Sequence, residues 1–163
     1  MNNIIIRKLA NQDYEGVSRV DILIQKQYLG EKWKKLSPVE KEEHLVSRQS
    51  EFEINVRSRY GFVACLNNKI IGFILAYETR PFLGNICIRY IGINPRYQGR
   101  GIGLLLYKQL IKKANENNAK KITALINLDN PNSMKLHQKA GFSLRDRKEA
   151  VYGLAKIKPE NLV

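Results

Sequence analysis

The sequence predicts an α+β (mixed α/β) fold, a central sheet with helices on both faces. Apolar strand patterns dominate residues 60–77 and 86–93, a long helical pattern occupies 102–114, and a further strand and helix follow at 121–140. The 163 residues, 44% of them hydrophobic, suit one domain, residues 1–163, with a single core.

The first third of the chain is expected to hold one strand and two helices. Residues 3–9 read as an early or edge strand. Asp13 can cap a helix that runs to about Tyr28 and ends at Gly30. Residues 37–40 form a capping box with proline at the first helical position, so a second helix is predicted from there to about Val56.

The middle of the chain is predicted to be three strands in succession. Residues 60–66 and 69–77 flank an Asn-Asn turn, which is typical of a hairpin. A turn at 79–85 leads into residues 86–93, which are apolar on both faces, as in a buried strand. Asn94-Pro95 ends this strand, because proline has no N–H for the ladder.

A glycine-rich turn joins this central strand to the next helix. Glycine lets a backbone approach a ligand closely, and a helix start offers free N–H groups and the positive end of the helix dipole. Arg96 and Arg100 add positive charge. The turn therefore predicts a phosphate or pyrophosphate site, although a tight turn that binds nothing is the alternative. It lacks the Lys-Ser/Thr ending of a P-loop, and Leu104 breaks a dinucleotide fingerprint.

The helix after this turn and the elements beyond it complete the predicted sheet. The helix is expected to bury a stripe of Ile102, Leu105, Leu106, Leu110 and Ile111. A strand at 121–128, a short helix from Asn130-Pro131 to Ala140-Gly141, and a hairpin of 142–144 with 150–157 are expected to follow.

Two segments of the chain resemble motifs of the GNAT N-acetyltransferases. NPRYQGRGIG, residues 94–103, resembles the coenzyme A pyrophosphate motif Q/R-x-x-G-x-G/A, and NPNSMKLHQKAGF, residues 130–142, resembles the second family motif. The resemblance implies transfer of an acetyl group from acetyl-CoA to a primary amine, either a protein or peptide N-terminus or a small molecule. It also implies a sheet that splays between its fourth and fifth strands, with the coenzyme in the resulting V. A non-catalytic acyl-CoA-binding or nucleic-acid-associated module is the alternative.

The same resemblance implies which residues contact the coenzyme. Main-chain N–H groups of the central strand would bind the acetyl carbonyl and the pantetheine arm, and the two motifs would bind the rest. Asn130 also suits a helix N-cap, and the two roles are compatible. The expected coenzyme-binding residues are Ile91, Gly92, Ile93, Arg96, Gln98, Gly99, Arg100, Gly101, Ile102, Gly103, Leu104, Asn130 and Ser133.

The catalytic side chains depart from the family pattern. His137 stands where the family often has a tyrosine that protonates the leaving thiolate, so His137 is expected to donate that proton or else to be a buried histidine without a role. Cys87 and Leu125 stand at the usual glutamate positions, and neither is a carboxylate base. Glu78 is the nearest alternative carboxylate; otherwise it is a solvated residue and water relays the proton.

Arg89 is the candidate for binding the acceptor. Period-two alternation places it on the strand face of Cys87 and Ile91. Its partner is then either a structural carboxylate or an anionic group of the substrate. In the second case, the acceptor is expected to carry an anionic group near its amine, in contrast to polyamines and aminoglycosides.

The net charge of +13 allows three explanations. These are a nucleic-acid partner, attraction for coenzyme phosphates, and a solvated lysine-rich surface; scattered basic residues make nucleic acid unlikely as a partner. No apolar run reaches the about 18 residues of a membrane helix, and the N-terminus does not resemble a signal peptide, so a cytoplasmic protein is expected. Cys65 and Cys87 are expected to be buried free thiols, no metal site is predicted, and a homodimer stays open.

Overall fold

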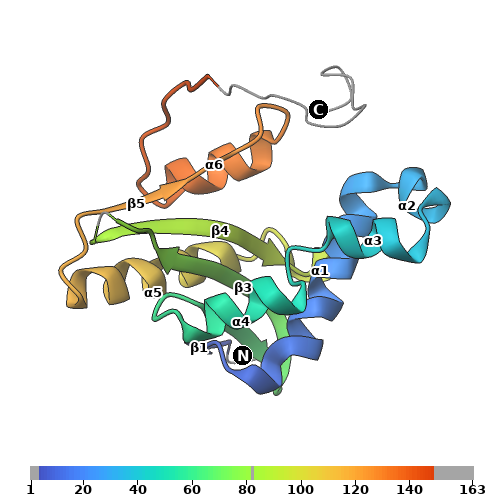
Figure 1. Cartoon of the computed structure of the whole chain (residues 1–163), viewed down its shortest axis with the longest axis horizontal. Helices are drawn as coiled ribbons and strands as arrows, with labels where there is room; N and C mark the ends of the chain where they lie inside the picture. Colours follow the sequence, from blue (N-terminus) through green and yellow to red (C-terminus); the bar gives the residue numbers. More distant parts are fainter. Residues whose placement is uncertain (1–3, 82, 149–163) are drawn as a thin grey trace.

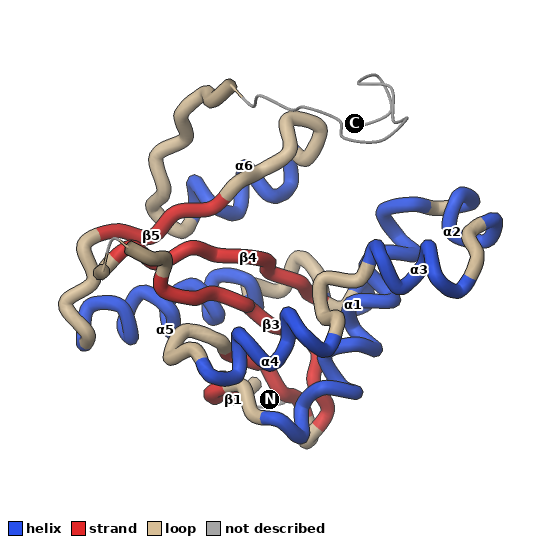
Figure 2. Tube along the Cα trace, viewed as in Figure 1, coloured by secondary structure: helices blue, strands red, loops and turns tan. Residues whose placement is uncertain are grey.

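The computed structural model describes residues 4–81 and 83–148, whose centre is a five-stranded mixed sheet (Figures 1 and 2). The strands lie in the order β1-β2-β3-β4-β5; the first three pairings are antiparallel and β4 pairs with β5 in parallel. Their bounds are β1 Ile5–Lys8, β2 Phe62–Leu66, β3 Lys69–Glu78, β4 Asn85–Ile93 and β5 Lys121–Ala124. The predicted mixed α/β class is therefore confirmed.

Helices cover both faces of this sheet. The long helix α5 packs on one face, and α1 and α4 pack on the other (Figure 1). The helices are α1 Tyr14–Leu29, α2 Glu31–Lys35, α3 Pro38–His44, α4 Gln49–Arg57, α5 Ile102–Glu116 and α6 Pro131–Lys139, with short 3-10 turns η1 Asn11–Asp13 and η2 Pro95–Tyr97. The sheet thus separates two apolar clusters, one under α5 and one under α1 and α4.

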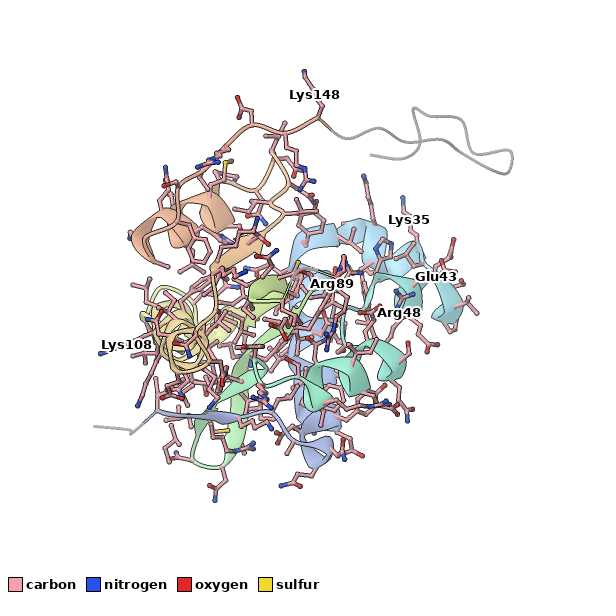
Figure 3. The ribbon with its side chains drawn as sticks, turned by 60° about the vertical axis from the view of Figure 1, so that its left-hand side comes forward. Lys35, Glu43, Arg48, Arg89, Lys108 and Lys148 are labelled. Carbon is pink, nitrogen blue, oxygen red and sulfur yellow. The ribbon has the colours of Figure 1, made fainter. Side chains whose placement is uncertain are left out.

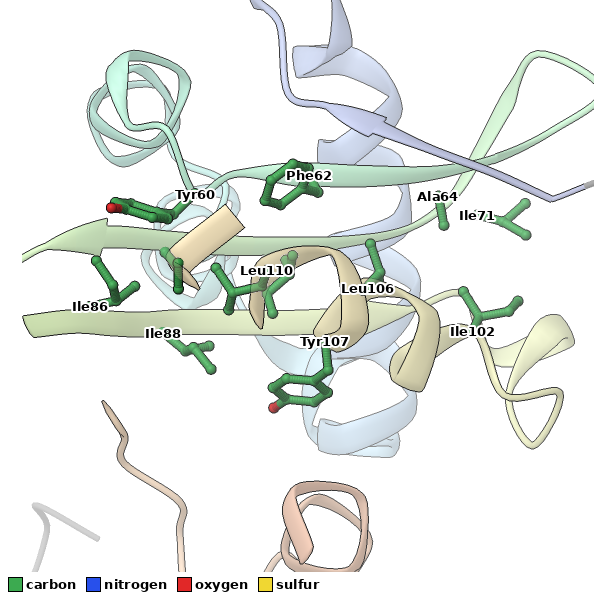
Figure 4. Packing of buried hydrophobic residues seen from close by; sticks show 13 residues of the cluster. Tyr60, Phe62, Ala64, Ile71, Ile86, Ile88, Ile102, Leu106, Tyr107 and Leu110 are labelled. Carbon is green, nitrogen blue, oxygen red and sulfur yellow. The ribbon is translucent and has the colours of Figure 1, made fainter. Parts of the chain in front are cut away.

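The cluster under α5 is the larger and holds the side chains that fix the candidate site (Figure 4). The predicted stripe is right at its centre, because Ile102, Leu106 and Leu110 are fully buried, but Leu105 is 40% exposed. Tyr107, which the apolar pattern missed, is buried in its place. A tyrosine that buries its hydroxyl needs a hydrogen-bond partner, and α6 supplies it.

The N-terminal helices differ from the prediction in three ways, the first being the short helix α2, Glu31–Lys35, which was not predicted. The expected helix from residue 37 to about Val56 is two helices, α3 and α4, separated at residues 45–48. The break occurs because the buried carboxylate of Asp21 accepts a hydrogen bond from the Ser47 N–H at 2.8 Å, which a continuous helix would engage internally. Asp13 makes no capping bond to α1; its carboxylate pairs with Arg7 at 2.7 Å and accepts the Ala10 N–H.

The C-terminal elements agree with the prediction for β5 and α6, but the predicted strand at 142–144 is wrong. The β5 strand ends at Ala124, four residues earlier than expected, and α6 begins after Asn130 as expected. Residues 142–148 contain no strand, and the predicted strand at 150–157 lies outside the described residues.

The sheet opens between β4 and β5. The two strands pair only over Asn85–Ile88 and Lys121–Ala124, and β4 then continues to Ile93 paired with β3 only. A bulge lies at the same point: Leu75 pairs with Tyr90 and Ala76 with Ile88, so Arg89 is an extra residue in β4. Within residues 4–81 and 83–148, one edge of β4 beyond this bulge has no strand beside it, so its backbone polar groups are available to a ligand.

Candidate functional site

A loop at the end of β4 presents a row of unpaired backbone donors. Gly99 and Gly101 have φ of +76° and +78°, the left-handed conformation that favours glycine, and both have open space where a Cβ would lie. Among the described residues, no oxygen accepts a hydrogen bond from the N–H groups of residues 99–104; the first paired N–H is that of Leu105, to the Gly101 carbonyl. Six adjacent donors at the positive end of α5 are suited to bind an anion, and we call residues 99–104 the anion loop.

The exposed side chain of Gln98 anchors this loop to its neighbours. Its amide nitrogen donates to the Ile93 carbonyl and to Oε1 of Gln27 on α1, both at 3.1 Å, and the Gln27 amide donates back at 3.4 Å. Gln98 therefore ties the loop to β4 and α1. The guanidinium groups of Arg96 and Arg100 are on exposed residues beside the free donors, and that of Arg100 lies 5.4 Å from the centre of the Tyr97 ring.

Gly103 has a packing role that the other two glycines of the motif lack. A Cβ on this residue would come within 3.0 Å of the Leu136 side chain, so its missing side chain lets α6 approach α5. The predicted motif thus contains two glycines chosen for backbone conformation and one chosen for helix packing.

The opening between β4 and β5 lies next to this loop. Ile91, Gly92 and Ile93 pair with β3 but lie beyond the pairing with β5, and Ile91 and Ile93 pack toward α5. On the other side of the opening, Asn130 caps α6: its Oδ1 accepts the Ser133 N–H at 3.0 Å. The Asn130 amide nitrogen has no partner within residues 4–81 and 83–148, so it remains free to donate to a ligand.

His137 is not positioned as a free proton donor. It is 3% exposed; its Nδ1 lies 2.8 Å from the Ser133 carbonyl and its Nε2 lies 2.8 Å from the Tyr107 hydroxyl. A carbonyl only accepts, so Nδ1 carries the proton and Nε2 accepts from Tyr107. Burial lowers the pKa of His137, which favours the neutral ring. We therefore do not assign the thiolate donor to His137, and the structure supports the alternative of a buried histidine.

Glu78 is also engaged. Its Oε1 accepts the Gly84 N–H at 2.6 Å and so closes the turn between β3 and β4.

Cys87 is partly buried and Cys65 is buried, so the expectation of two buried thiols is right only for Cys65, whose pKa is raised by burial. Leu125, just after β5, is 78% exposed.

The bulge corrects the predicted orientation of Arg89. Because Arg89 is the extra residue, strict alternation fails there: Ile91 packs toward α5 together with Ile86 and Ile88, so it does not share a face with Arg89 and Cys87. The Arg89 side chain, labelled in Figure 3, is 51% exposed. Its Nε lies 3.7 Å from Oε2 of Glu51 on α4. The structural carboxylate partner therefore exists, at a distance that leaves the other guanidinium donors free.

The end of α1 contributes residues that the sequence did not single out. Gln27 contacts the anion loop through Gln98, and the Tyr28 hydroxyl donates to Asp129, before α6, at 3.4 Å. These contacts link α1 to both sides of the site across more than 70 residues of sequence. No local sequence pattern predicts them.

Two negative findings concern the described residues alone. They contain no group of three or more His, Cys, Asp or Glu side chains arranged to hold a metal ion. In the same part of the chain, no helix is long and apolar enough to cross a membrane.

Several solved structures share this arrangement of elements. The PaiA N-acetyltransferase of Thermoplasma acidophilum, solved with coenzyme A, matches with a TM-score of 0.75 and 19% identity over 90% of this chain and 93% of its own. The aminoglycoside N-acetyltransferase AAC(6')-Iy, solved with CoA, has a TM-score of 0.70 and 17% identity over 95% and 97%. The ribosomal-protein-S18-alanine N-acetyltransferase of Escherichia coli has a TM-score of 0.61 and 15% identity over 88% and 80%.

At such low identity these structures show only a shared fold, but the sequence itself matches a family. Residues 26–142 match the profile of the Acetyltransferase (GNAT) family, a range that includes both motifs, the β4 bulge and the opening between β4 and β5. The chain therefore belongs to the Acetyltransferase (GNAT) family.

Proposed function

We propose that this protein transfers an acetyl group from acetyl-CoA to a primary amine, on a protein or peptide N-terminus or on a small molecule. The observation that carries the proposal is the row of unpaired N–H groups at residues 99–104, next to the opening between β4 and β5. Backbone donors at a helix start suit a pyrophosphate, and membership of an acetyltransferase family supplies the reaction type.

The coenzyme would extend from this loop along the free edge of β4. The N–H groups of residues 99–104, with Arg96 and Arg100, would hold the pyrophosphate, and Gln98 would hold the loop in shape. The backbone of residues 91–93 would bind the pantetheine arm, and the free amide of Asn130 with Ser133 would bind from α6. When bound, the coenzyme supplies an activated acetyl thioester.

The chain's own residues would then orient the thioester and the amine. Backbone N–H groups of β4 near the bulge would donate to the acetyl oxygen, where negative charge develops. Holding both reactants together removes a large part of the barrier. The amine must lose a proton, and with Glu78 bound to the Gly84 N–H and no carboxylate at Cys87 or Leu125, we assign that proton to water. The C–S bond of the thioester would break as the amide forms, and the leaving coenzyme A thiolate would take up a proton from water.

Arg89 remains the proposed acceptor-binding residue. Its exposed guanidinium keeps donors beyond the long contact with Glu51, and these suit a carboxylate or phosphate near the reacting amine. A cation near the bound ammonium also lowers the pKa of that ammonium, which favours the neutral nucleophile.

The test is a transfer assay with acetyl-CoA and a panel of acidic, neutral and polycationic amines, in which free thiol and acetylated product are measured separately. We expect product and thiol in equal amounts with at least one acidic or neutral amine. Calorimetric binding of acetyl-CoA without transfer to any amine would instead indicate a non-catalytic acyl-CoA-binding module. Absence of acetyl-CoA binding would overturn the proposal.

A further inference from the structure

A buried chain of hydrogen bonds links α5 to the amino end of α6. The Tyr107 hydroxyl donates to His137 Nε2 at 2.8 Å, His137 Nδ1 donates to the Ser133 carbonyl at 2.8 Å, and the Ser133 N–H donates to Asn130 Oδ1 at 3.0 Å. This series of hydrogen bonds begins on α5, the helix that follows the anion loop. It ends at Asn130, the N-cap of α6, on the other side of the opening.

Packing around this chain fixes its geometry. The rings of Tyr107, His137 and Phe142 meet edge to face in three pairs, with centroids 5.3 to 5.4 Å apart. One turn closer to the anion loop, Gly103 lets Leu136 approach the backbone of α5. Figure 4 shows Tyr107 projecting from α5 toward the ribbon of α6, while its neighbours Leu106 and Leu110 point to the sheet.

The hydrogen bond has a consequence beyond packing because of where β5 ends. Past Ala124 no strand pairing joins β4 to the segment that leads to α6, so the sheet does not fix the position of Asn130 relative to the anion loop. Within the described residues, the contacts between α5 and α6 link the two halves of the site directly, whereas the hydrogen bonds of Gln27 and Tyr28 link them only through α1.

We propose that the Tyr107–His137 hydrogen bond is a positioning contact that holds Asn130 and Ser133 at the spacing from the 99–104 donors that coenzyme A requires. This inference rests on the proposed function, because it assumes that the coenzyme bridges the two halves. Tyr107 and His137 are thus positioning residues; neither touches the substrate, since both are at most 3% exposed.

The experiment compares wild type with Tyr107→Phe, which removes one oxygen and keeps the ring that packs on Phe142. The KM for acetyl-CoA and the calorimetric Kd for coenzyme A should rise about three- to tenfold, the effect of one lost buried hydrogen bond, while kcat at saturating acetyl-CoA stays within about twofold. Tyr60→Phe is the matched control: Tyr60 is buried in the same cluster and its hydroxyl makes no hydrogen bond within the described residues. It should leave both constants unchanged.

An unchanged Kd in folded Tyr107→Phe would overturn the proposal, and so would a loss of kcat with unchanged Kd, which would make the pair part of the chemistry. Failure of the wild type to bind coenzyme A would refute the proposed function itself. If Tyr107→Phe does not fold, imidazole nitrogen shifts of the wild type still decide: the proposal requires a neutral His137 with the proton on Nδ1, both with and without coenzyme A. A proton on Nε2 in either state would contradict it.

Discussion

Arg89 owes its environment to a single extra residue in β4. The bulge turns its side chain out of the regular alternation, to a half-exposed position 3.7 Å from Glu51. The sequence could place an arginine in the central strand and could anticipate a carboxylate partner. It could not place the bulge, because a bulge depends on pairing with β3 and not on the local pattern.

Replacing Arg89 tests its proposed role toward the acceptor. We expect Arg89→Gln to raise the KM for an acidic acceptor about threefold or more and to leave the Kd for coenzyme A unchanged, because the lost contact is to the acceptor only. Initial rates at varied acceptor concentration measure this. Arg57→Gln is the control, since Arg57 is exposed and pairs with Glu53 on the same helix. Equal KM values for wild type and Arg89→Gln would remove Arg89 from the site.

His137 makes a prediction about pH and stability. Its pKa is lowered by burial, so on acidification the unfolded state takes up the proton first. The stability that neutral His137 contributes is present above the unfolded pKa of about 6.5 and is lost as the pH falls below it toward the folded pKa. Asp21 acts in the opposite sense, since burial raises its pKa.

Comparison of the wild type with His137→Gln isolates the contribution of His137 to the pH dependence of stability. Urea unfolding between pH 7.5 and 5 should show a smaller loss of unfolding free energy in His137→Gln than in wild type, because glutamine does not take up a proton. Both proteins keep Asp21, so its contribution cancels in the comparison. His44→Gln is the control variant, since His44 is an exposed residue at the end of α3. Parallel pH curves for wild type and His137→Gln would show that His137 does not couple to folding.

Among the elements, the sequence predicted those whose boundaries are local. Asn67 and Asn68 form the β2–β3 turn with φ of 47° and 62°, Ser37 and Glu40 form the capping box, and Asn130 caps α6. The break between α3 and α4 was not predictable, because it depends on Asp21, a residue 26 positions away from Ser47. Tyr107 was missed because its burial depends on a hydrogen bond to His137 on another helix, and the apolar pattern of α5 does not contain that partner.

The link between α1 and the anion loop gives a prediction at the same scale. Gln98→Ala removes two anchors, to Ile93 and to Gln27, whereas Gln27→Ala removes only the second. We expect coenzyme A affinity to fall about three- to tenfold in Gln98→Ala and less than threefold in Gln27→Ala. Calorimetry of both variants measures the order. A larger loss in Gln27→Ala would mean that α1, and not β4, holds the loop.

Over the whole molecule, the fold separates structural from functional demands. Two apolar clusters bury the sheet on either side, and the opening between β4 and β5 leaves one strand edge and one helix start unpaired. The net charge of +13 is more than a local coenzyme patch explains. Both motifs and the order of the five strands with α5 and α6 were readable from the sequence, whereas α2 and the break between α3 and α4 were not.

The central claim, that the N–H groups of residues 99–104 hold the pyrophosphate, is tested most directly by coenzyme A binding to Gly101→Asp. The new carboxylate would face the phosphates at a position where the backbone must approach them. Gly141→Asp is the matched control, because Gly141 also has positive φ, at +95°, and open space around it, and the charge change is the same. Calorimetry should show the affinity of Gly101→Asp falling about tenfold or more, roughly 1.4 kcal/mol, with Gly141→Asp near wild type. Unchanged affinity in folded Gly101→Asp, or an equal loss in both variants, would contradict the account.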